Sequence, residues 1–215
     1  MFTGIIEEIG TVKEVMPATE SLELVIAASK VLEDVHLGDS IAINGVCLTV
    51  TSFTEDAFTA DVMPETFHST SLSKVRRGSK VNLERAMSAN GRFGGHFVSG
   101  HVDGVGTVSG KRQVENALYM DITYPSECAS YLMPKGSVAL DGTSLTIFGV
   151  NEKELTISLI PHTQEETILA QKAIGEPVNI ECDMLAKYVE RMVNRQPEKP
   201  SSNITMELLE RNGFA

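Results

Sequence analysis

The chain repeats itself at a fixed distance, and this internal repeat restricts the fold more than any other feature of the sequence. When residues 38–85 are shifted by 97 positions onto residues 135–182, no gap is needed and 15 of the 48 aligned pairs are identical. About three identities are expected by chance at average residue usage. Residues 4–12 align in the same way with residues 100–108, at a spacing of 96. Array repeats are roughly 20 to 50 residues long, so a repeat of this length predicts two homologous domains rather than a solenoid.

The repeat also preserves polar residues that lie between apolar runs. Thr49 aligns with Thr146, and Thr66 aligns with Thr163. Packing in a core would mainly preserve apolar positions, so the recurrence of these threonines indicates two related ligand pockets.

Each repeat contains six short runs of alternating or β-branched residues, separated by Gly, Asp, Asn and Pro. Closing such strands into a barrel removes the exposed sheet edges that invite aggregation. The sequence therefore predicts an all-β protein of two tandem six-stranded antiparallel β-barrels. In the first repeat we expect strands at 4–15, 21–28, 39–43, 46–53, 57–63 and 79–85, with short helices at 30–34 and 65–72.

The predicted domain boundaries follow from the repeat. We expect the first barrel at residues 1–87, a linker without rigid structure at 88–96, the second barrel at 97–184 and a tail at 185–215. The tail has no counterpart in the first half, and its apolar residues predict a helix that either packs on its own barrel or mediates self-association. These apolar residues are Leu185, Tyr188, Val189, Met192 and Val193.

The charge balance limits the classes of partner. The chain has 18 basic and 29 acidic residues, a net charge of −11, which argues against binding to nucleic acid or to anionic membranes. It contains neither a signal-peptide pattern nor a run of 18 apolar residues, so we expect a cytoplasmic protein. Its three cysteines, Cys47, Cys128 and Cys182, lack C-x-x-C spacing and predict free thiols rather than disulfides or a zinc site.

Five segments, in order along the chain, closely resemble the riboflavin synthase family, and in particular its Bacillus type. They are MFTGIIE at 1–7, NGVCLTV at 44–50, MPET at 63–66, GGHFVSGHVD at 94–103 and DGTSLT at 141–146. The resemblance covers residues 1 to about 187. It implies two Greek-key barrels related by a pseudo-twofold axis, and a C-terminal helix through which three subunits associate.

The resemblance also implies an activity. Members of this family convert two molecules of 6,7-dimethyl-8-ribityllumazine into riboflavin and 5-amino-6-(ribitylamino)uracil by transferring a four-carbon unit, with no cofactor or metal. The two substrate molecules meet between barrels of neighbouring subunits in a homotrimer. In some bacilli a capsid of lumazine synthase encloses the trimer, which makes lumazine synthase a candidate partner. The alternative is a related antenna protein that binds a lumazine or flavin without catalysis. The preserved residues in both repeats favour the enzyme.

The ligand contacts implied by the resemblance fall in corresponding segments of the two repeats, with Lys135 reaching in from a neighbouring subunit. In the first repeat they are Gly4, Ile5, Ile6, Cys47, Leu48, Thr49, Asp61, Val62, Met63, Pro64, Glu65 and Thr66. In the second they are Gly100, His101, Val102, Ser144, Leu145, Thr146, Ser158, Leu159, Ile160, Pro161, His162 and Thr163.

Donor and acceptor are the same molecule, so positions at which the repeats differ are candidates for distinct roles. Cys47 aligns with Ser144; a thiol is the stronger nucleophile and a hydroxyl the better hydrogen-bond partner. His101 is a candidate base for proton loss from a lumazine methyl group, because imidazole titrates near neutral pH. The competing interpretation of Cys47 is that it only fills a core. His96 is interpreted mainly as a residue that orders the glycine-rich linker, with a functional role as the alternative.

Overall fold

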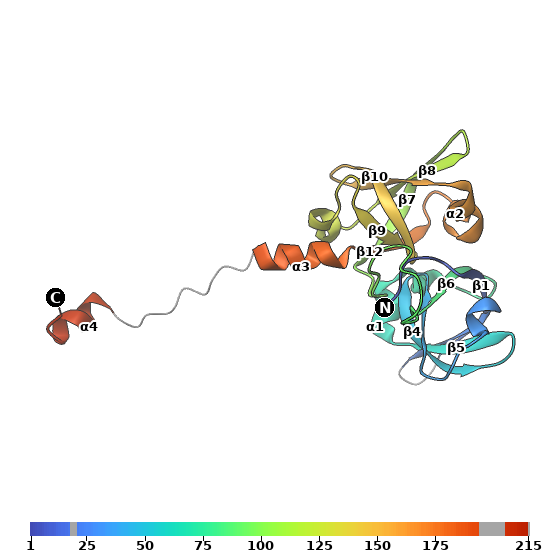
Figure 1. The fold of residues 1–215 in the computed structure, drawn as a ribbon, viewed down its shortest axis with the longest axis horizontal. Coiled ribbons are helices and arrows are strands. Elements are labelled where there is room, and N and C mark those ends of the chain that lie inside the picture. The colour runs from blue at the N-terminus through green and yellow to red at the C-terminus, as the bar shows by residue number, and fades with distance from the viewer. Residues whose placement is uncertain (18–20, 194–204, 215) are drawn as a thin grey trace.

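The structure, a computed structural model, describes residues 1–17, 21–193 and 205–214. Its first six strands form a closed antiparallel barrel in the order β1-β2-β5-β4-β3-β6 (Figure 1). The short helix α1 (Pro64–Ser69) follows the fifth strand. The strands are β1 (Glu8–Pro17), β2 (Leu22–Ala27), β3 (Ser40–Ile43), β4 (Val46–Phe53), β5 (Ala57–Val62) and β6 (Lys80–Arg85).

The second barrel has the same topology. Starting from its first strand, the order is β7-β8-β11-β10-β9-β12, and α2 (Pro161–Glu166) occupies the place of α1. The prediction of two Greek-key six-stranded barrels is confirmed. The strands are β7 (Gly104–Val114), β8 (Ala117–Thr123), β9 (Ser137–Leu140), β10 (Thr143–Val150), β11 (Glu154–Leu159) and β12 (Pro177–Cys182).

A two-residue turn joins β3 to β4, and its copy joins β9 to β10. Asn44 and Gly45 have φ angles of 48° and 77°, and Asp141 and Gly142 have φ angles of 43° and 79°. Asn-Gly and Asp-Gly are favoured in such turns because both positions need positive φ. The two turns meet between the barrels, where a Cβ on Gly45 would lie 2.6 Å from the backbone nitrogen of Gly142.

Each barrel encloses its own apolar core, formed by the inward-facing residues that alternate along its strands. Leu24, Ile26 and Phe58 are at most 1% exposed in the first barrel, as are Met120 and Ile147 in the second. A fully buried side chain of this kind stabilises the fold by about 1.5 to 3 kcal/mol. The alternating apolar pattern of the sequence therefore serves two small cores rather than one shared core.

The ends of the first barrel differ from the prediction. The first strand begins at Glu8 rather than at residue 4, because Gly4 has a φ of 77° and its carbonyl accepts a hydrogen bond from the Ser144 N–H of the second barrel (2.7 Å). The linker at 88–96 was expected to lack rigid structure, yet its last residue is fixed. The His96 N–H donates to the Thr3 carbonyl (3.1 Å), just before an antiparallel bridge between Phe2 and Val98.

Beyond the second barrel the chain forms α3 (Met184–Val193) and, further on, α4 (Met206–Arg211). Helix α3 leaves β12 and projects away from both barrels (Figure 1). Its apolar stripe is exposed, from 56% at Leu185 to 77% at Val193, so the alternative in which the helix packs on its own barrel is wrong. Residues 194–204 of the predicted tail lie outside the described residues.

Candidate functional site

The two residues predicted to break the symmetry of the repeat, Cys47 and Ser144, occupy equivalent places on β4 and β10. The Cys47 N–H donates to the Gly100 carbonyl (2.9 Å), and the Ser144 N–H donates to the Gly4 carbonyl (2.7 Å). The opening segment of each repeat therefore crosses over and lies on the barrel of the other repeat. The structure groups residues 100–102 with Cys47, and residues 4–6 with Ser144.

Only glycine fits at the two crossing points. Gly4 and Gly100 have φ angles of 77° and 84°. A Cβ at Gly4 would lie 2.6 Å from Cβ of Ser144, and one at Gly100 would lie 2.5 Å from Cβ of Cys47. This close approach holds the backbone at Gly4 against Ser144 and the backbone at Gly100 against Cys47.

A buried glutamate from the last strand of each barrel anchors the crossing segments. The Glu84 carboxylate accepts hydrogen bonds from the Thr3 N–H (2.7 Å) and hydroxyl (2.8 Å), and the Glu181 carboxylate accepts from the Ser99 N–H (2.6 Å). Burial raises the pKa of Glu84, although the hydrogen bonds from Thr3 act in the opposite direction. These carboxylates satisfy backbone donors that would otherwise be buried without partners.

The strand register brings the other predicted segments beside Cys47 and Ser144. Because Val50 pairs with Ala60, the part of β4 that contains Cys47 and Thr49 runs beside the end of β5 that leads into α1. In the second barrel Ile147 pairs with Ile157, which gives the same arrangement of β10, β11 and α2. Each candidate site therefore consists of two strand ends and a helix start from one barrel, plus a crossing segment from the other repeat.

The predicted contact residues differ in what they can offer to a ligand. Leu48, Val62 and Leu159 lie in the barrel cores, so a ligand could reach only their backbone. Cys47 and Ser144 are partly exposed. The exposed members are Ile5, Thr49, Asp61, Met63, Pro64, Glu65, His101, Lys135, Thr146, Ile160, Pro161 and His162. Ile6, Thr66, Val102, Leu145, Ser158 and Thr163 are partly buried.

His96, which was not among the predicted site residues, contacts Ser144. The Nδ1 atom of His96 lies 2.7 Å from Oγ of Ser144, and its Nε2 atom is buried with no hydrogen-bond partner among the described residues. Burial lowers the pKa of His96, so the imidazole stays neutral at a pH where an exposed histidine is protonated. A neutral imidazole beside a hydroxyl can act as its general base.

Among the described residues, no histidine forms a hydrogen bond with the Cys47 side chain in the way that His96 does with Ser144. The histidine nearest in sequence to the Cys47 contact is His101, which directly follows Gly100 and is exposed. The two candidate sites are thus alike in backbone and different in their acid–base groups.

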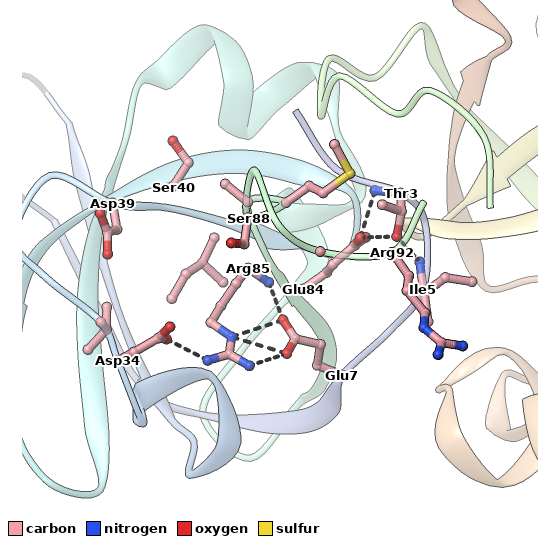
Figure 2. Close-up of a pocket in the computed structure, with 15 residues that line it drawn as sticks. Thr3, Ile5, Glu7, Asp34, Asp39, Ser40, Glu84, Arg85, Ser88 and Arg92 are labelled. Atoms are coloured by element: carbon pink, nitrogen blue, oxygen red, sulfur yellow. Dashed lines mark hydrogen bonds and ion pairs between the residues drawn. The ribbon is translucent and has the colours of Figure 1, made fainter. Parts of the chain in front are cut away.

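A cavity of about 410 Å³ lies next to the first barrel, between β3, β6 and residues 86–92, and neither Cys47 nor Ser144 lines it (Figure 2). Within it the Arg85 guanidinium pairs with the carboxylates of Glu7 and Asp34, at 2.5 Å in both cases. These ion pairs raise the pKa of Arg85. The cavity therefore holds an ion-paired network in which one guanidinium pairs with two carboxylates; of the predicted contact residues, Ile5 lines the cavity and the others lie outside it.

Comparison with known proteins decides the family. The lumazine binding domain family matches this chain twice, over residues 3–86 and 99–183. The riboflavin synthase of Bacillus subtilis (strain 168) is 56% identical over 215 residues, which is the full length of both chains. That of Actinobacillus pleuropneumoniae is 48% identical, again over the full length of both. This chain belongs to the riboflavin synthase family.

Solved structures similar to this riboflavin synthase family member include complexes of LumP. The complex with riboflavin has a TM-score of 0.79 and 25% sequence identity, and the alignment covers 85% of this chain and 99% of LumP. The complex with 6,7-dimethyl-8-(1'-D-ribityl) lumazine has a TM-score of 0.76 and 26% identity. Sequence identity to the synthases is about twice as high, which favours the enzyme over the antenna alternative.

The other two cysteines and Lys135 lie in the second barrel. Cys128 and Cys182 are buried in the second core and contact each other, which together with burial raises the pKa of Cys182. Lys135 is exposed in the turn before β9, where it adopts a φ of 67°.

Within residues 1–17, 21–193 and 205–214, no group of His, Cys, Asp and Glu side chains is arranged to hold a metal ion. None of the helices described is long and apolar enough to span a membrane.

Proposed function

We propose that this chain catalyses the dismutation of two molecules of 6,7-dimethyl-8-ribityllumazine to riboflavin and 5-amino-6-(ribitylamino)uracil. The observation that carries this proposal is the 56% identity to a riboflavin synthase over the full length of both chains. The duplicated site suits a reaction between two copies of one molecule, because each copy requires a similar pocket.

The test is direct. Purified protein incubated with the lumazine alone should produce riboflavin absorbance, with one riboflavin formed for each two lumazines consumed. Tight binding without any turnover would support the antenna alternative instead.

We infer that the reacting pair of sites forms between subunits of a homotrimer. Two features support this inference: the predicted contact residues lie on an open surface of the single chain, and the apolar stripe of α3 is exposed. A neighbouring barrel would cover that surface and exclude water from the two rings. Lys135, exposed on the second barrel, is the side chain we expect to reach a neighbouring site. Cytoplasmic location and enclosure by lumazine synthase stay predictions.

The two sites can divide the chemistry because their polar groups differ. We assign Cys47 to contact with one lumazine ring, as a nucleophile or specific polar contact, and Ser144 to orientation of the other. We assign to His101, on the crossing segment beside Cys47, the role of the base that receives a proton from a lumazine methyl group. His96 holds the Ser144 hydroxyl at 2.7 Å and can accept its proton.

Replacing the thiol should slow turnover more than it weakens binding. We expect Cys47→Ser to lower kcat at least tenfold, which corresponds to about 1.4 kcal/mol in the barrier, with little change in lumazine affinity. Ser144→Ala should behave similarly if its hydroxyl orients the second substrate. Cys128→Ser is the control, because this thiol is buried in the core and its loss should affect stability alone. Normal turnover of Cys47→Ser would show that Cys47 only packs.

Replacing His96 should separate binding from proton transfer. His96→Gln leaves a hydrogen-bonding group beside Ser144 but removes the base, so kcat should fall by about 100-fold with affinity largely unchanged. The pKa of His96 is lowered, so its neutral form should persist as the pH falls below 6.5 and be lost only at its own lower pKa. The part of the acid limb of kcat that depends on His96 should therefore lie below pH 6.5 in the native enzyme and be lost in His96→Gln. His36→Gln, at a side chain that is 83% exposed, should leave the pH profile unchanged.

A further inference from the structure

A second cleft, of about 230 Å³, lies between the two barrels and includes none of the residues predicted to contact lumazine. Ten of its lining residues form five pairs related by the repeat, among them Ser71 with Ile168 and Lys74 with Gln171. The cleft therefore lies on the pseudo-twofold axis, with the same positions of both barrels facing each other.

The chemistry of the two walls is unequal although their positions are equivalent. The first barrel contributes Lys74 and Lys80, where the second has the uncharged Gln171 and Pro177. The Lys80 ammonium donates to the neutral hydroxyl of Thr11 (2.8 Å), which leaves its charge uncompensated. Lys74 is exposed and forms no ion pair within the described part of the chain.

The floor of the cleft contains a third ammonium, that of Lys172, whose side chain is 12% exposed. It lies 2.8 Å from the fully buried Asp141 carboxylate and donates to the Pro177 carbonyl (2.6 Å). An ammonium has three N–H donors, so one remains after these two contacts. The Asp141 carboxylate neutralises the charge of Lys172, but the remaining N–H of the ammonium can still donate a hydrogen bond.

The lining of the same cleft includes a buried hydroxyl, that of Ser71, with no hydrogen-bond partner among the described residues. Ser71 is 4% exposed, and its backbone N–H donates to the Asn179 side chain across the barrel interface (2.7 Å). Its Oγ atom is buried and forms no hydrogen bond to any described residue. Native structures leave few buried polar groups unpaired, so a hydroxyl in this position indicates a missing hydrogen-bond partner, to which it could donate.

Among the described residues that line the cleft, Glu176 carries the one carboxylate. It lies at the exposed rim, and its Oε2 atom accepts a hydrogen bond from the Ala173 N–H in the same turn (2.5 Å). Counting Lys74, Lys80 and Glu176, and treating Lys172 with Asp141 as neutral, the lining has a net charge of +1. At the floor the Ser71 hydroxyl and the remaining N–H of Lys172 can donate, while the buried Oδ2 atom of Asp141 is ion-paired with the Lys172 ammonium.

We propose that this cleft binds a small tetrahedral oxyanion, either inorganic phosphate or the phosphoryl group of a phosphomonoester. The Ser71 hydroxyl and the remaining N–H of Lys172 would donate to its oxygens at the floor, and the ammonium groups of Lys74 and Lys80 would balance its charge at the rim. Because both barrels line the cleft, the anion would bind the assembled pair of barrels and stabilise their contact.

The test is a titration of the full-length protein with inorganic phosphate at constant ionic strength, followed by the amide signals of Ser71 and Ile168 in nuclear magnetic resonance spectra. Both signals should shift and saturate. Ser71→Ala and Lys74→Gln should each weaken binding by about tenfold, the loss expected for one hydrogen bond or contact to a charged group. Lys30→Gln removes the same charge from an exposed site outside the cleft and should leave the affinity unchanged.

Two results would overturn the proposal: the absence of saturable shifts at these amides, or equal affinities in Lys74→Gln, Ser71→Ala and Lys30→Gln. Ser71 and Lys74 are expected to tolerate these changes, since one substitution removes only a hydroxyl and the other alters an exposed side chain. A parallel titration with glycerol 3-phosphate distinguishes the two sources of the anion. Tighter binding of the ester would assign the site to phosphomonoesters, and equal or weaker binding would assign it to free phosphate.

Discussion

Removal of the chain after Asp183 should abolish trimer formation and lower turnover by about 100-fold or more, while the two barrels remain folded. The deleted helix α3 contributes no buried residue to either barrel. The helix forms an ion pair with the second barrel, between Lys187 and Asp103 (2.5 Å), and without it Asp103 would still accept the hydrogen bond from the Cys182 N–H (2.7 Å). Turnover would fall because holding two reactants together supplies a large part of the rate of such a reaction.

Sedimentation and light scattering would measure the oligomeric state of the truncated protein, and steady-state kinetics its turnover. A matched pair of point variants separates the apolar stripe from the rest of the helix. Val189→Gln places an amide in the stripe and should weaken association, whereas Arg191→Gln places the same residue at an exposed position outside it and should not. A fully active truncated monomer would contradict both the trimer and the shared site.

The two barrels were predictable because the sequence carries their pattern in local form. Apolar residues alternate along each strand, and Asn44-Gly45 and Asp141-Gly142 mark the tight turns between them. The start of the first strand was not predictable in the same way. The stretch Gly4 to Glu7 has the composition of a strand, yet the positive φ of Gly4 directs it to the other barrel.

The sequence also could not predict which site residues lie together. Alignment of the repeats pairs Gly4 with Gly100 and Cys47 with Ser144, but it does not show on which of the two barrels each segment packs. His96 was missed for a related reason: glycine-rich surroundings indicate a flexible linker, and its contact with Ser144 spans 48 residues. A histidine at the end of a linker, adjacent to a repeated segment, is the signal that could have identified it.

The contact between the barrels should depend strongly on two asparagines that the repeat preserves, Asn82 and Asn179. The Asn82 amide donates to the Asp141 carbonyl (2.9 Å) and accepts from the Ile168 N–H (2.9 Å), both in the second barrel. Asn179 makes the reciprocal contacts with the Asn44 carbonyl (2.8 Å) and the Ser71 N–H (2.7 Å). Both asparagines are at most 1% exposed, so each side chain satisfies buried backbone groups that water does not reach.

Asn82→Ala should therefore lower the free energy of unfolding by about 3 to 5 kcal/mol, since it leaves a buried N–H and a buried carbonyl unpaired at roughly 1 to 3 kcal/mol each, in addition to a small cavity. Urea unfolding measures the loss, and Asn90→Ala, at an exposed asparagine in the linker, should change stability by less than about 0.5 kcal/mol. Asn179→Ala should lower the free energy of unfolding by less in the Asn82→Ala variant than in the native protein, because the contact between the barrels would already be weakened. In the double variant the barrels should unfold in two separate transitions. A loss below about 1 kcal/mol in Asn82→Ala would mean that the apolar contacts of Phe2 and Val98, rather than the asparagines, hold the barrels together.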